Sequence, residues 1–433
     1  MKTFINSIDL SELMEAKRFV GRKDEMDLLI NSLNKQGAEL IILYGRRRVG
    51  KTRLLEELSK RIHIDLSLMF EEADYTTNLS KFAQKILERY NYPSFEPKTF
   101  REAFLSIPEN TIIILDEFSY IQTIGEFQAI WEEVCKKKNH KVILCGSMIR
   151  IMEDMAYSIK SPLYGRATCI IKLMPLKFAE VVEWYKGEDI EDILTTYFCV
   201  GGIPRYLELI DTPGEKEVLN AFVDKNSILL REGKLLLKES FPSSEIYPKI
   251  MFALSKGCTE PVKIANEIHI PAQQISKYLL ILCDYGFAEK RMPFFGGGKK
   301  DVRYYMADPF FEYWIRFAWL NYNEIENGKK IIPTKEQLNS YYGRQFEKTV
   351  RESYMKAGTQ WGKDYDIDVV AQDGKKLILI ECKWQKEVDA DEIMRKLTEA
   401  GKFISGAKSY TIYAKSYKRK TKDAECYTLK DLR

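Results

Sequence analysis

Histidine is scarce in this chain of 433 residues, and its cysteines form no pattern. Three histidines are too few for a histidine-rich metal site, and they argue against a Ser-His-Asp triad. The eight cysteines are scattered and include no Cys-x-x-Cys pair, which argues against disulfides and zinc ligands. The chemistry available to this protein is therefore that of carboxylates, lysines, arginines and bound phosphates.

Long apolar runs are also lacking. No run approaches the roughly 20 residues needed to cross a bilayer, and residues 1–10 lack the charged start and apolar stretch of a signal peptide. The composition, 45% hydrophobic and 30% charged, excludes collagen-like, low-complexity and disordered classes. We therefore expect a cytoplasmic protein with no membrane partner and, at about 100–200 residues per domain, two to four domains.

The formal net charge of +4 is too small to indicate nucleic-acid binding by itself. Its distribution is more informative. Residues 328–433 hold 23 Lys and Arg against 16 Asp and Glu, so the positive charge is concentrated there, especially in the run 415–422. This distribution favours nucleic acid as a partner of the C-terminal part.

Residues 39–173 alternate short apolar runs with helix-period segments, which predicts a parallel α/β sheet. Residues 175–240 have mostly helical patterns. The predicted strands are Glu39–Tyr44, Ile112–Asp116, Lys141–Gly146 and Cys169–Met174.

Three short helical patterns near 247–256, 261–268 and 272–284 precede a β-hairpin, which is the element order of a winged helix. Such modules bind DNA or act as protein contacts and spacers, and both uses remain open. An aromatic helix is predicted at 309–326. The hairpin cations that could track phosphates are Lys290, Arg291, Lys299, Lys300 and Arg303.

Residues 45–52 fit the phosphate-loop pattern GxxxxGK(S/T) between a predicted strand and a predicted helix. Glycines let backbone N–H groups turn toward phosphates, Lys51 reaches the β- and γ-phosphates, and Thr52 can bind Mg²⁺. This pattern predicts binding of ATP with Mg²⁺. The predicted nucleotide-binding residues here are Gly45, Arg46, Arg47, Arg48, Val49, Gly50, Lys51 and Thr52.

Acidic residues end the second predicted strand. Asp116 lies at the carboxyl edge of the sheet, where it can hold Mg²⁺ through water, and Glu117 is then the candidate base for the attacking water. Ser147 follows the next strand, where it could sense the γ-phosphate; a helix N-cap is an equal alternative for it.

The sequence resembles the archaeal-type ATPases of the AAA+/STAND group, P-loop proteins with a winged helix and a restriction-endonuclease-like C-terminal domain. The resemblance covers essentially the whole chain. It rests on the phosphate loop and on the segments Phe19-Val20-Gly21-Arg22-Lys23-Asp24-Glu25, Leu115-Asp116-Glu117-Phe118, Cys145-Gly146-Ser147, Pro162-Leu163-Tyr164-Gly165-Arg166 and Gly201-Gly202-Ile203-Pro204-Arg205-Tyr206.

This resemblance implies roles that spacing alone does not show. The segment 19–22 would lie near the adenine, and Ile203-Pro204 would contact the base from a helical lid. Arg166 would be a γ-phosphate sensor or arginine finger, although it could equally be a surface ion-pair former. A homo-oligomer is left open. The predicted domains are a P-loop core at 1–174, a lid at 175–240, a winged helix with the aromatic helix at 241–327 and a nuclease-like domain at 328–433.

Asp373-Gly374 lies between two apolar runs, which predicts a hairpin. With these two residues as the turn, Asp366 faces Glu381. Because side chains alternate along a strand, four charged side chains emerge on one face and suit a Mg²⁺ site. They are Asp366, Asp368, Glu381 and Lys383.

The order Asp…Glu-x-Lys resembles the PD-(D/E)xK nuclease motif, with Asp368, Glu381 and Lys383 in matching positions and Ile367 in place of its proline. Glu347 matches that family's upstream helix acid. A solvated hairpin face with a cross-strand ion pair is the alternative, and so is a nuclease fold that no longer cleaves.

Together these observations predict an α/β P-loop ATPase, followed by a helical lid, a winged helix and an α/β nuclease-like domain. We expect ATP binding and hydrolysis with Mg²⁺, and a nucleotide state that controls a DNA-directed C-terminal domain. The alternatives are an ATP-dependent regulatory switch that does not cut and a transcription regulator that acts through the winged helix.

Overall fold

The computed structural model describes residues 19–120, 124–159, 161–241, 244–298 and 301–432, so Lys299 and Lys300 of the predicted wing lie outside the described residues. The chain forms two compact units. Of the described residues, the first unit comprises those within 19–45, 51–147 and 152–173, and the second comprises those within 46–50, 148–151 and 174–432.

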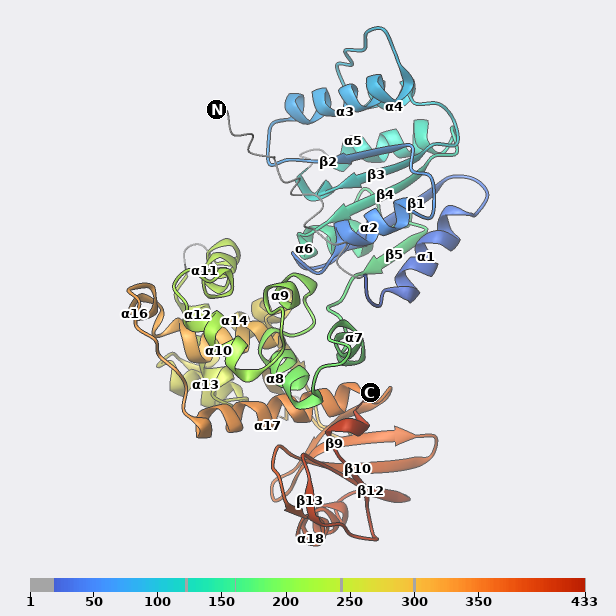
Figure 1. The fold of residues 1–433 in the computed structure, drawn as a ribbon. Coiled ribbons are helices and arrows are strands. Elements are labelled where there is room, and N and C mark those ends of the chain that lie inside the picture. The colour runs from blue at the N-terminus through green and yellow to red at the C-terminus, as the bar shows by residue number, and fades with distance from the viewer. Residues whose placement is uncertain (1–18, 121–123, 160, 242–243, 299–300, 433) are drawn as a thin grey trace, which may run out of the picture. The chain divides into compact units, whose positions relative to one another are not determined.

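The first unit is built on a parallel five-stranded sheet in the order β2-β3-β4-β1-β5 (Figure 1). The central strand β1 is buried at every residue because helices cover both faces of the sheet. The strands are β1 (Glu39–Tyr44), β2 (Leu66–Met69), β3 (Ile112–Asp116), β4 (Lys141–Gly146) and β5 (Cys169–Lys172). The predicted parallel α/β class is confirmed.

Three of the four predicted strands have their predicted bounds. The fourth, β5, ends at Lys172 and not at Met174. Leu173 N still donates to the Tyr44 carbonyl at 2.6 Å, and Pro175, two residues further on, has no N–H with which to extend the pairing.

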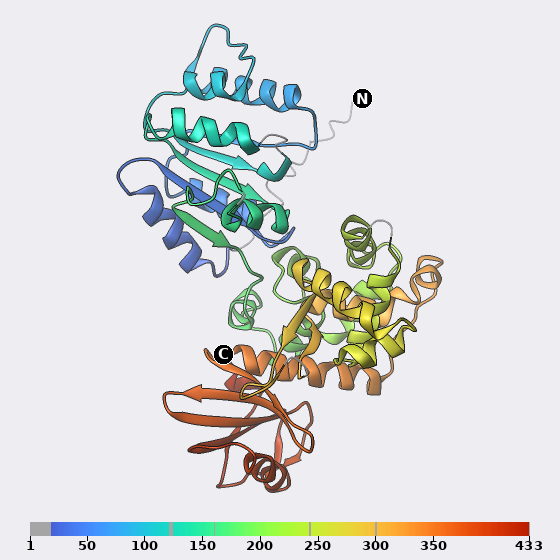
Figure 2. The same ribbon diagram turned by 180° about the vertical axis from the view of Figure 1, so that it is seen from behind.

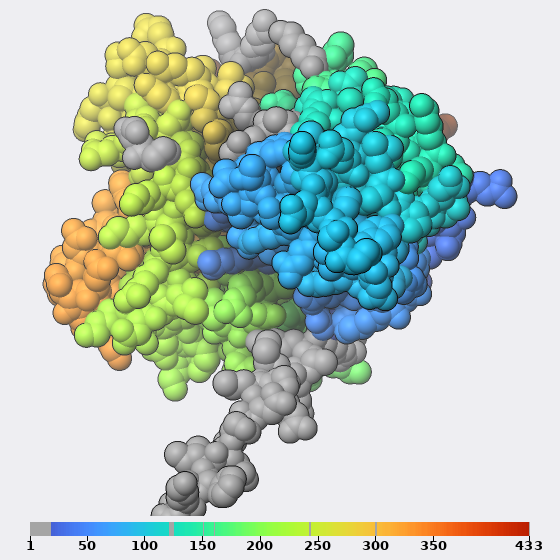
Figure 3. Space-filling view, turned by 90° about the horizontal axis from the view of Figure 1, so that it is seen from above, coloured from blue at the N-terminus to red at the C-terminus, as the bar shows by residue number. Residues whose placement is uncertain are grey.

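Helices connect these strands. Side chains of α3 and α4 cover one face of the first unit (light blue in Figure 3). Between β3 and β4, the short α-helix Ile124–Ile130 continues into a π-helical turn, Trp131–Cys135. The helices are α1 (Lys23–Leu33), α2 (Lys51–Ser59), α3 (Tyr75–Tyr90), α4 (Phe100–Ser106), α5 (Ile124–Ile130) and α6 (Ile149–Tyr157).

The second unit begins with helices and continues with the element order predicted for a winged helix. The helices are α7 (Phe178–Trp184), α8 (Ile190–Val200), α9 (Pro204–Leu209), α10 (Glu215–Val223) and α11 (Ile228–Ser240). The next elements are α12 (Ile246–Ser255), α13 (Pro261–Glu267), α14 (Ala272–Asp284) and the antiparallel hairpin of β6 (Ala288–Arg291) and β7 (Arg303–Met306).

The aromatic segment 309–326 is interrupted, whereas the sequence predicted one helix. It forms α15 (Pro309–Tyr313), a π-helical turn (Trp314–Trp319) and α16 (Tyr322–Glu326). Trp314 is buried against α11, and its indole Nε1 donates to the Leu230 carbonyl at 2.8 Å. The aromatic side chains of Phe310, Phe311, Tyr313 and Trp314 are buried and form core.

Gly233 on α11 is the residue that lets this indole pack closely. A Cβ on Gly233 would lie 2.2 Å from Cδ2 of Trp314. We expect Gly233→Ala to lower the free energy of unfolding by about 3 kcal/mol, because a methyl group there overpacks the core. Chemical denaturation measures this. Gly343→Ala is the matched control: it lies in a helix with open space around it, and its stability should be unchanged or about 1 kcal/mol higher.

The unit ends in a mixed five-stranded sheet of order β14-β12-β10-β9-β8, seen from behind in Figure 2. Its helices are α17 (Lys335–Glu352) and α18 (Ala390–Gly401). The strands are β8 (Ala357–Trp361), β9 (Asp366–Asp373), β10 (Lys376–Lys383), β12 (Lys408–Ala414) and β14 (Glu425–Tyr427); β11 (Val388–Asp389) pairs with β13 (Tyr417–Arg419) separately.

The β9–β10 hairpin forms, but its predicted turn is wrong by one residue. Asp373 pairs with Lys376, so the turn residues are Gly374 and Lys375. Gly374 has φ +58° and Lys375 does not have positive φ, which fits a turn that takes glycine at its first central position. The pairing therefore shifts by two residues relative to the predicted register. A shift of two keeps each side chain on its predicted face.

Candidate functional site

The phosphate-loop sequence connects β1 to α2. Lys51 is the first residue of α2 and is buried, and its Nζ donates to the Gly45 carbonyl at 3.0 Å. Gly50 has φ +97°, and a Cβ on Gly45 would lie 2.4 Å from the Leu173 carbonyl oxygen. The chain therefore turns tightly onto a helix N-terminus, which is the local geometry that binds phosphate.

The two predicted magnesium ligands are in contact. Thr52 Oγ1 donates to Oδ2 of Asp116 at 2.9 Å, and Asp116, the last residue of β3, is only 4% exposed. A hydroxyl and a carboxylate at the carboxyl edge of a parallel sheet supply the oxygen donors that Mg²⁺ prefers. These residues fit the metal that the sequence predicts.

Glu117 and Ser147 also meet. The Glu117 carboxylate accepts hydrogen bonds from Ser147 Oγ at 2.8 Å and from Ser147 N at 3.2 Å. Glu117 has φ +49°, which is unusual for a residue with a side chain, and its own N–H donates to Asp116 at 2.9 Å. The structure thus connects Thr52, Asp116, Glu117 and Ser147 through direct hydrogen bonds.

The three consecutive arginines of the loop, residues 46–48, belong to the second unit, and each has a carboxylate partner there. Arg46 forms an ion pair with Asp308. Arg47 Nη1 lies 2.8 Å from both carboxylate oxygens of Glu239, and Arg48 Nη1 lies 2.5 Å from Glu232. Sequence reasoning missed these three acids, because residues so far apart in the chain carry no local signal of pairing.

Pro204 lies beside the same loop residues. A Cβ on Gly50 would lie 3.7 Å from Cγ of Pro204, the first residue of α9. The base contact that the family resemblance implies for Pro204 remains a prediction.

Arg166 forms an ion pair with a carboxylate of the first unit. Its Nε donates to Glu132 at 2.8 Å, and its Nη1 donates to the Tyr164 carbonyl at 3.3 Å. This is the ion-pair alternative recognised from the sequence. A role at the γ-phosphate would require Arg166 to leave Glu132, and it stays a prediction.

The C-terminal carboxylates gather where α17 packs on β9 and β10. Asp368 Oδ2 accepts from the Cys382 N–H at 2.9 Å, and Glu381 accepts from Lys383 Nζ at 2.6 Å. The observed pairing ends with Ile380 opposite Val369. Continued along both strands, this register would bring Asp368 opposite Glu381, where the sequence predicted that Asp366 faces Glu381.

The charges on this face influence one another. Burial and the Glu381 carboxylate raise the pKa of Glu347 to about 7, against the effect of Lys383. Burial and the Glu347 carboxyl raise the pKa of Asp368 well above its usual value. Burial alone would lower the pKa of Lys383, but Glu381 and Asp368 raise it. Glu347, Asp368, Glu381 and Lys383 therefore influence one another electrostatically, and their role as a metal site stays a prediction.

A complete metal cage is not formed by them. Within the described ranges, no group of three or more His, Cys, Asp or Glu side chains is arranged to hold a metal ion. Lys383 Nζ donates a hydrogen bond to one carboxylate oxygen of Glu381. Asp366 is mostly exposed, and its carboxylate forms an ion pair with Arg303 at 3.5 Å.

The hairpin predicted as the wing of a winged helix packs against the C-terminal sheet. Phe294 N donates to the Thr359 carbonyl of β8 at 3.0 Å, and Phe294 packs on the core beneath β9 and β10. Arg303 stacks over the Trp361 ring at 4.5 Å, and Arg291 pairs with Glu289. Two of the predicted phosphate-tracking cations thus have partners within the chain.

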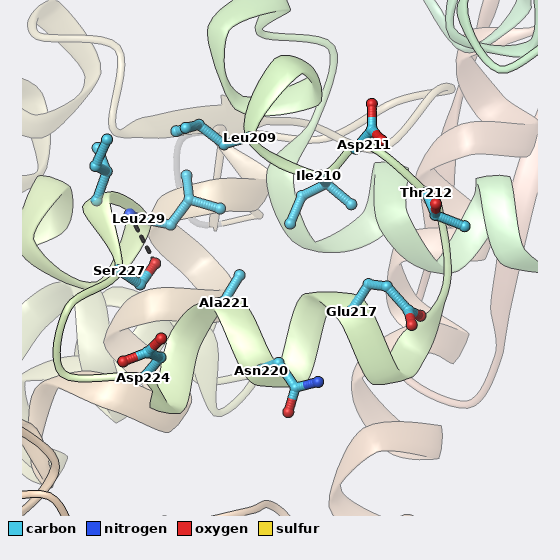
Figure 4. A pocket seen from close by; sticks show the side chains of 11 residues that line it. Leu209, Ile210, Asp211, Thr212, Glu217, Asn220, Ala221, Asp224, Ser227 and Leu229 are labelled. Atoms are coloured by element: carbon cyan, nitrogen blue, oxygen red, sulfur yellow. Dashed lines mark hydrogen bonds between the residues drawn. The ribbon is translucent and has the colours of Figure 1, made fainter. Parts of the chain in front are cut away.

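A pocket of about 530 Å³ lies among α9, α10 and the start of α11 (Figure 4). Its floor is apolar and its rim is acidic and amide-bearing, and the Leu229 N–H donates to Ser227 Oγ at 3.1 Å. No residue predicted for nucleotide or metal binding lines it. The lining residues are Leu209, Ile210, Asp211, Thr212, Glu217, Asn220, Ala221, Asp224, Ser227, Ile228 and Leu229.

No helix in the described part of the chain is long and apolar enough to span a membrane. A family model for an ATPase domain found predominantly in Archaea matches residues 19–210. A model for archaeal and bacterial proteins of unknown function matches residues 314–394.

The chain is also similar to individual proteins. An uncharacterized protein of Methanocaldococcus jannaschii is 31% identical over 420 residues, which cover 91% of this chain and 94% of the relative. An uncharacterized ATP-binding protein of the same organism is 46% identical over 52 residues, 12% of this chain and 88% of that protein.

A solved structure supports the fold. The Walker-type ATPase of Pyrococcus abyssi is similar with a TM-score of 0.51 at 20% identity, covering 69% of this chain and 96% of that one. With the phosphate loop, the parallel sheet and a relative that matches over nearly its whole length, the chain belongs to the archaeal-type P-loop ATPase family.

Proposed function

We propose that this ATPase works with Mg²⁺ and that its nucleotide state controls a DNA-directed, nuclease-like C-terminal domain. At the nucleotide, Lys51 would bind the phosphates, and Thr52 and Asp116 would hold the metal ion. Mg²⁺ would neutralise charge that develops on the phosphate oxygens. Glu117 would accept a proton from the attacking water, and Ser147 fixes the position of its carboxylate.

The proposed role of the C-terminal domain rests on one observation. Four charged side chains meet where α17 contacts the β9–β10 hairpin: Glu347, Asp368, Glu381 and Lys383. Buried carboxyls that repel one another have raised pKa values, and such clusters are typical of functional sites. A divalent cation would relieve this repulsion. Asp368 and Glu381 would be its ligands, and Lys383 would stabilise the phosphorane-like transition state.

DNA is the proposed substrate because the positive charge of the chain is concentrated in residues 328–433, the part of the chain that contains these carboxylates. Residues Lys418, Arg419, Lys420 and Lys422 are exposed. Exposed cations in the same domain as a candidate metal site suit a phosphodiester backbone.

A second candidate function is a regulatory switch that hydrolyses ATP but does not cut. Two observations favour it: the carboxylates do not form a complete cage, and Lys383 already neutralises Glu381. In this form Lys383 and Glu381 serve as a structural ion pair, and the C-terminal domain binds DNA or a protein partner.

Cleavage of supercoiled plasmid separates the two functions. With Mg²⁺ or Mn²⁺, we expect the wild-type protein to nick the plasmid, and Asp368→Ala or Glu381→Ala to reduce the rate at least about 100-fold, because each removes a metal ligand. The assay compares ATP with a non-hydrolysable analogue. Asp373→Ala, an exposed change in the same hairpin, is the control and should cut at the wild-type rate.

Cleavage that survives both alanine variants would show that these carboxylates are not the catalytic ones. A wild-type protein that cuts no DNA with either metal, with or without ATP, would establish the switch in place of the nuclease.

A further inference from the structure

The phosphate loop contains a residue in a conformation that side chains rarely adopt. Arg48 has φ +67°. It is the third residue of a tight turn closed by the Val49 N–H, which donates to the Arg46 carbonyl at 3.4 Å. Turns with positive φ at this position prefer glycine or asparagine there. An arginine in the left-handed region is strained, so other contacts must hold it there.

The contact that holds Arg48 comes from α11. The guanidinium of Arg48 lies 2.5 Å from Glu232 on α11, and the side chain of Glu232 is 2% exposed. The same carboxylate accepts a hydrogen bond from the Tyr206 hydroxyl at 3.1 Å, and Tyr206 is also buried. A buried carboxylate needs a cationic or hydrogen-bonding partner, so Glu232 and Arg48 depend on each other.

The neighbouring pair provides a contrast on the same helix. Arg47 and Glu239 also meet at 2.8 Å, but their side chains are 43% and 51% exposed. Ion pairs as exposed as this one contribute little. Of these two pairs between the loop and α11, the buried one is therefore expected to matter.

We propose that Glu232 is a positioning residue for ATP binding: by pairing with Arg48 it keeps the phosphate loop in the turn that presents its backbone N–H groups to the phosphates. In this proposal the side chain of Arg48 acts as the partner of Glu232, and the backbone of the loop contacts the phosphates. The loop's shape thus depends on a residue of α11, a helix that precedes the C-terminal sheet by almost 120 residues of chain.

Steady-state ATPase kinetics test this assignment. Glu232→Gln keeps the size of the side chain and an acceptor for Tyr206 but removes the charge that binds Arg48. We expect the KM for ATP to rise about tenfold with kcat within about twofold, because the lost contact shapes the loop before chemistry. Glu239→Gln, the matched control, should change KM less than about twofold.

Glycine at position 48 supplies the decisive variant. It adopts positive φ without cost, so the loop no longer needs Glu232. The double variant Arg48→Gly/Glu232→Gln should therefore return KM to within about threefold of wild type, whereas Arg48→Ala/Glu232→Gln should not.

A thermal melt of each variant accompanies the kinetics. A Glu232→Gln protein with wild-type KM would overturn the proposal. A glycine double variant with the same KM as the alanine one would overturn it too. If Glu232→Gln does not fold, the comparison of Arg48→Gly with Arg48→Ala decides, since only the alanine variant is expected to raise KM.

Discussion

ATP turnover by a Lys51→Ala variant is expected to fall at least about 100-fold, with loss of measurable nucleotide affinity. The ammonium of Lys51 is buried at the first turn of α2 and held by the Gly45 carbonyl, so it is positioned before ATP arrives. A preorganised charge in a site of low water content stabilises phosphate oxygens far more than a mobile one. Fluorescent-nucleotide titration and a phosphate-release assay measure the two effects.

Lys60→Ala is the control for this variant. Lys60 follows α2 closely, and it is exposed and paired with Glu57. We expect turnover within about twofold of wild type. A Lys51→Ala protein that still binds ATP would contradict the assignment of the phosphate loop.

Glu117→Gln is expected to separate binding from hydrolysis. The amide retains a hydrogen bond to Ser147 but cannot accept the proton of the attacking water, so ATP should bind normally and be hydrolysed at least about 100-fold more slowly. A single-turnover experiment with excess protein measures the hydrolytic step directly.

The control here is Glu109→Gln, an exposed change before β3 in the same unit, which should leave the single-turnover rate unchanged. Wild-type hydrolysis by Glu117→Gln would mean that another group activates the water. Loss of ATP binding instead would make Glu117 part of the binding surface.

Strong local patterns predicted much of the fold. Strands β1, β3 and β4 could be placed because each is a continuous apolar run buried on both sides. Strand β2 was missed: Leu66–Met69 is four residues long, alternates buried and exposed side chains, and lies at the edge of the sheet. Such a short segment carries too little periodicity to be recognised.

In the candidate sites too, some contacts could be predicted from the sequence and others could not. The contacts among Lys51, Thr52 and Asp116 follow from a motif and from the rule that parallel strands end at one edge. The hairpin register was wrong by two residues because Asp373-Gly374 and Gly374-Lys375 are both acceptable turns, and local sequence does not choose between them. The partners of Arg48 and Arg166 depend on tertiary packing, which no spacing rule encodes.

The packing of Phe294 on the C-terminal core determines where a fragment that contains this domain must begin. Its ring fills space that Gly358 leaves open: a Cβ there would lie 2.9 Å from the ring. A fragment that starts at residue 328, the domain boundary that the sequence predicts, would lack Phe294. One side of its hydrophobic core would then be exposed to solvent. The smallest fragment that we expect to fold by itself therefore begins upstream of the hairpin that contains Phe294.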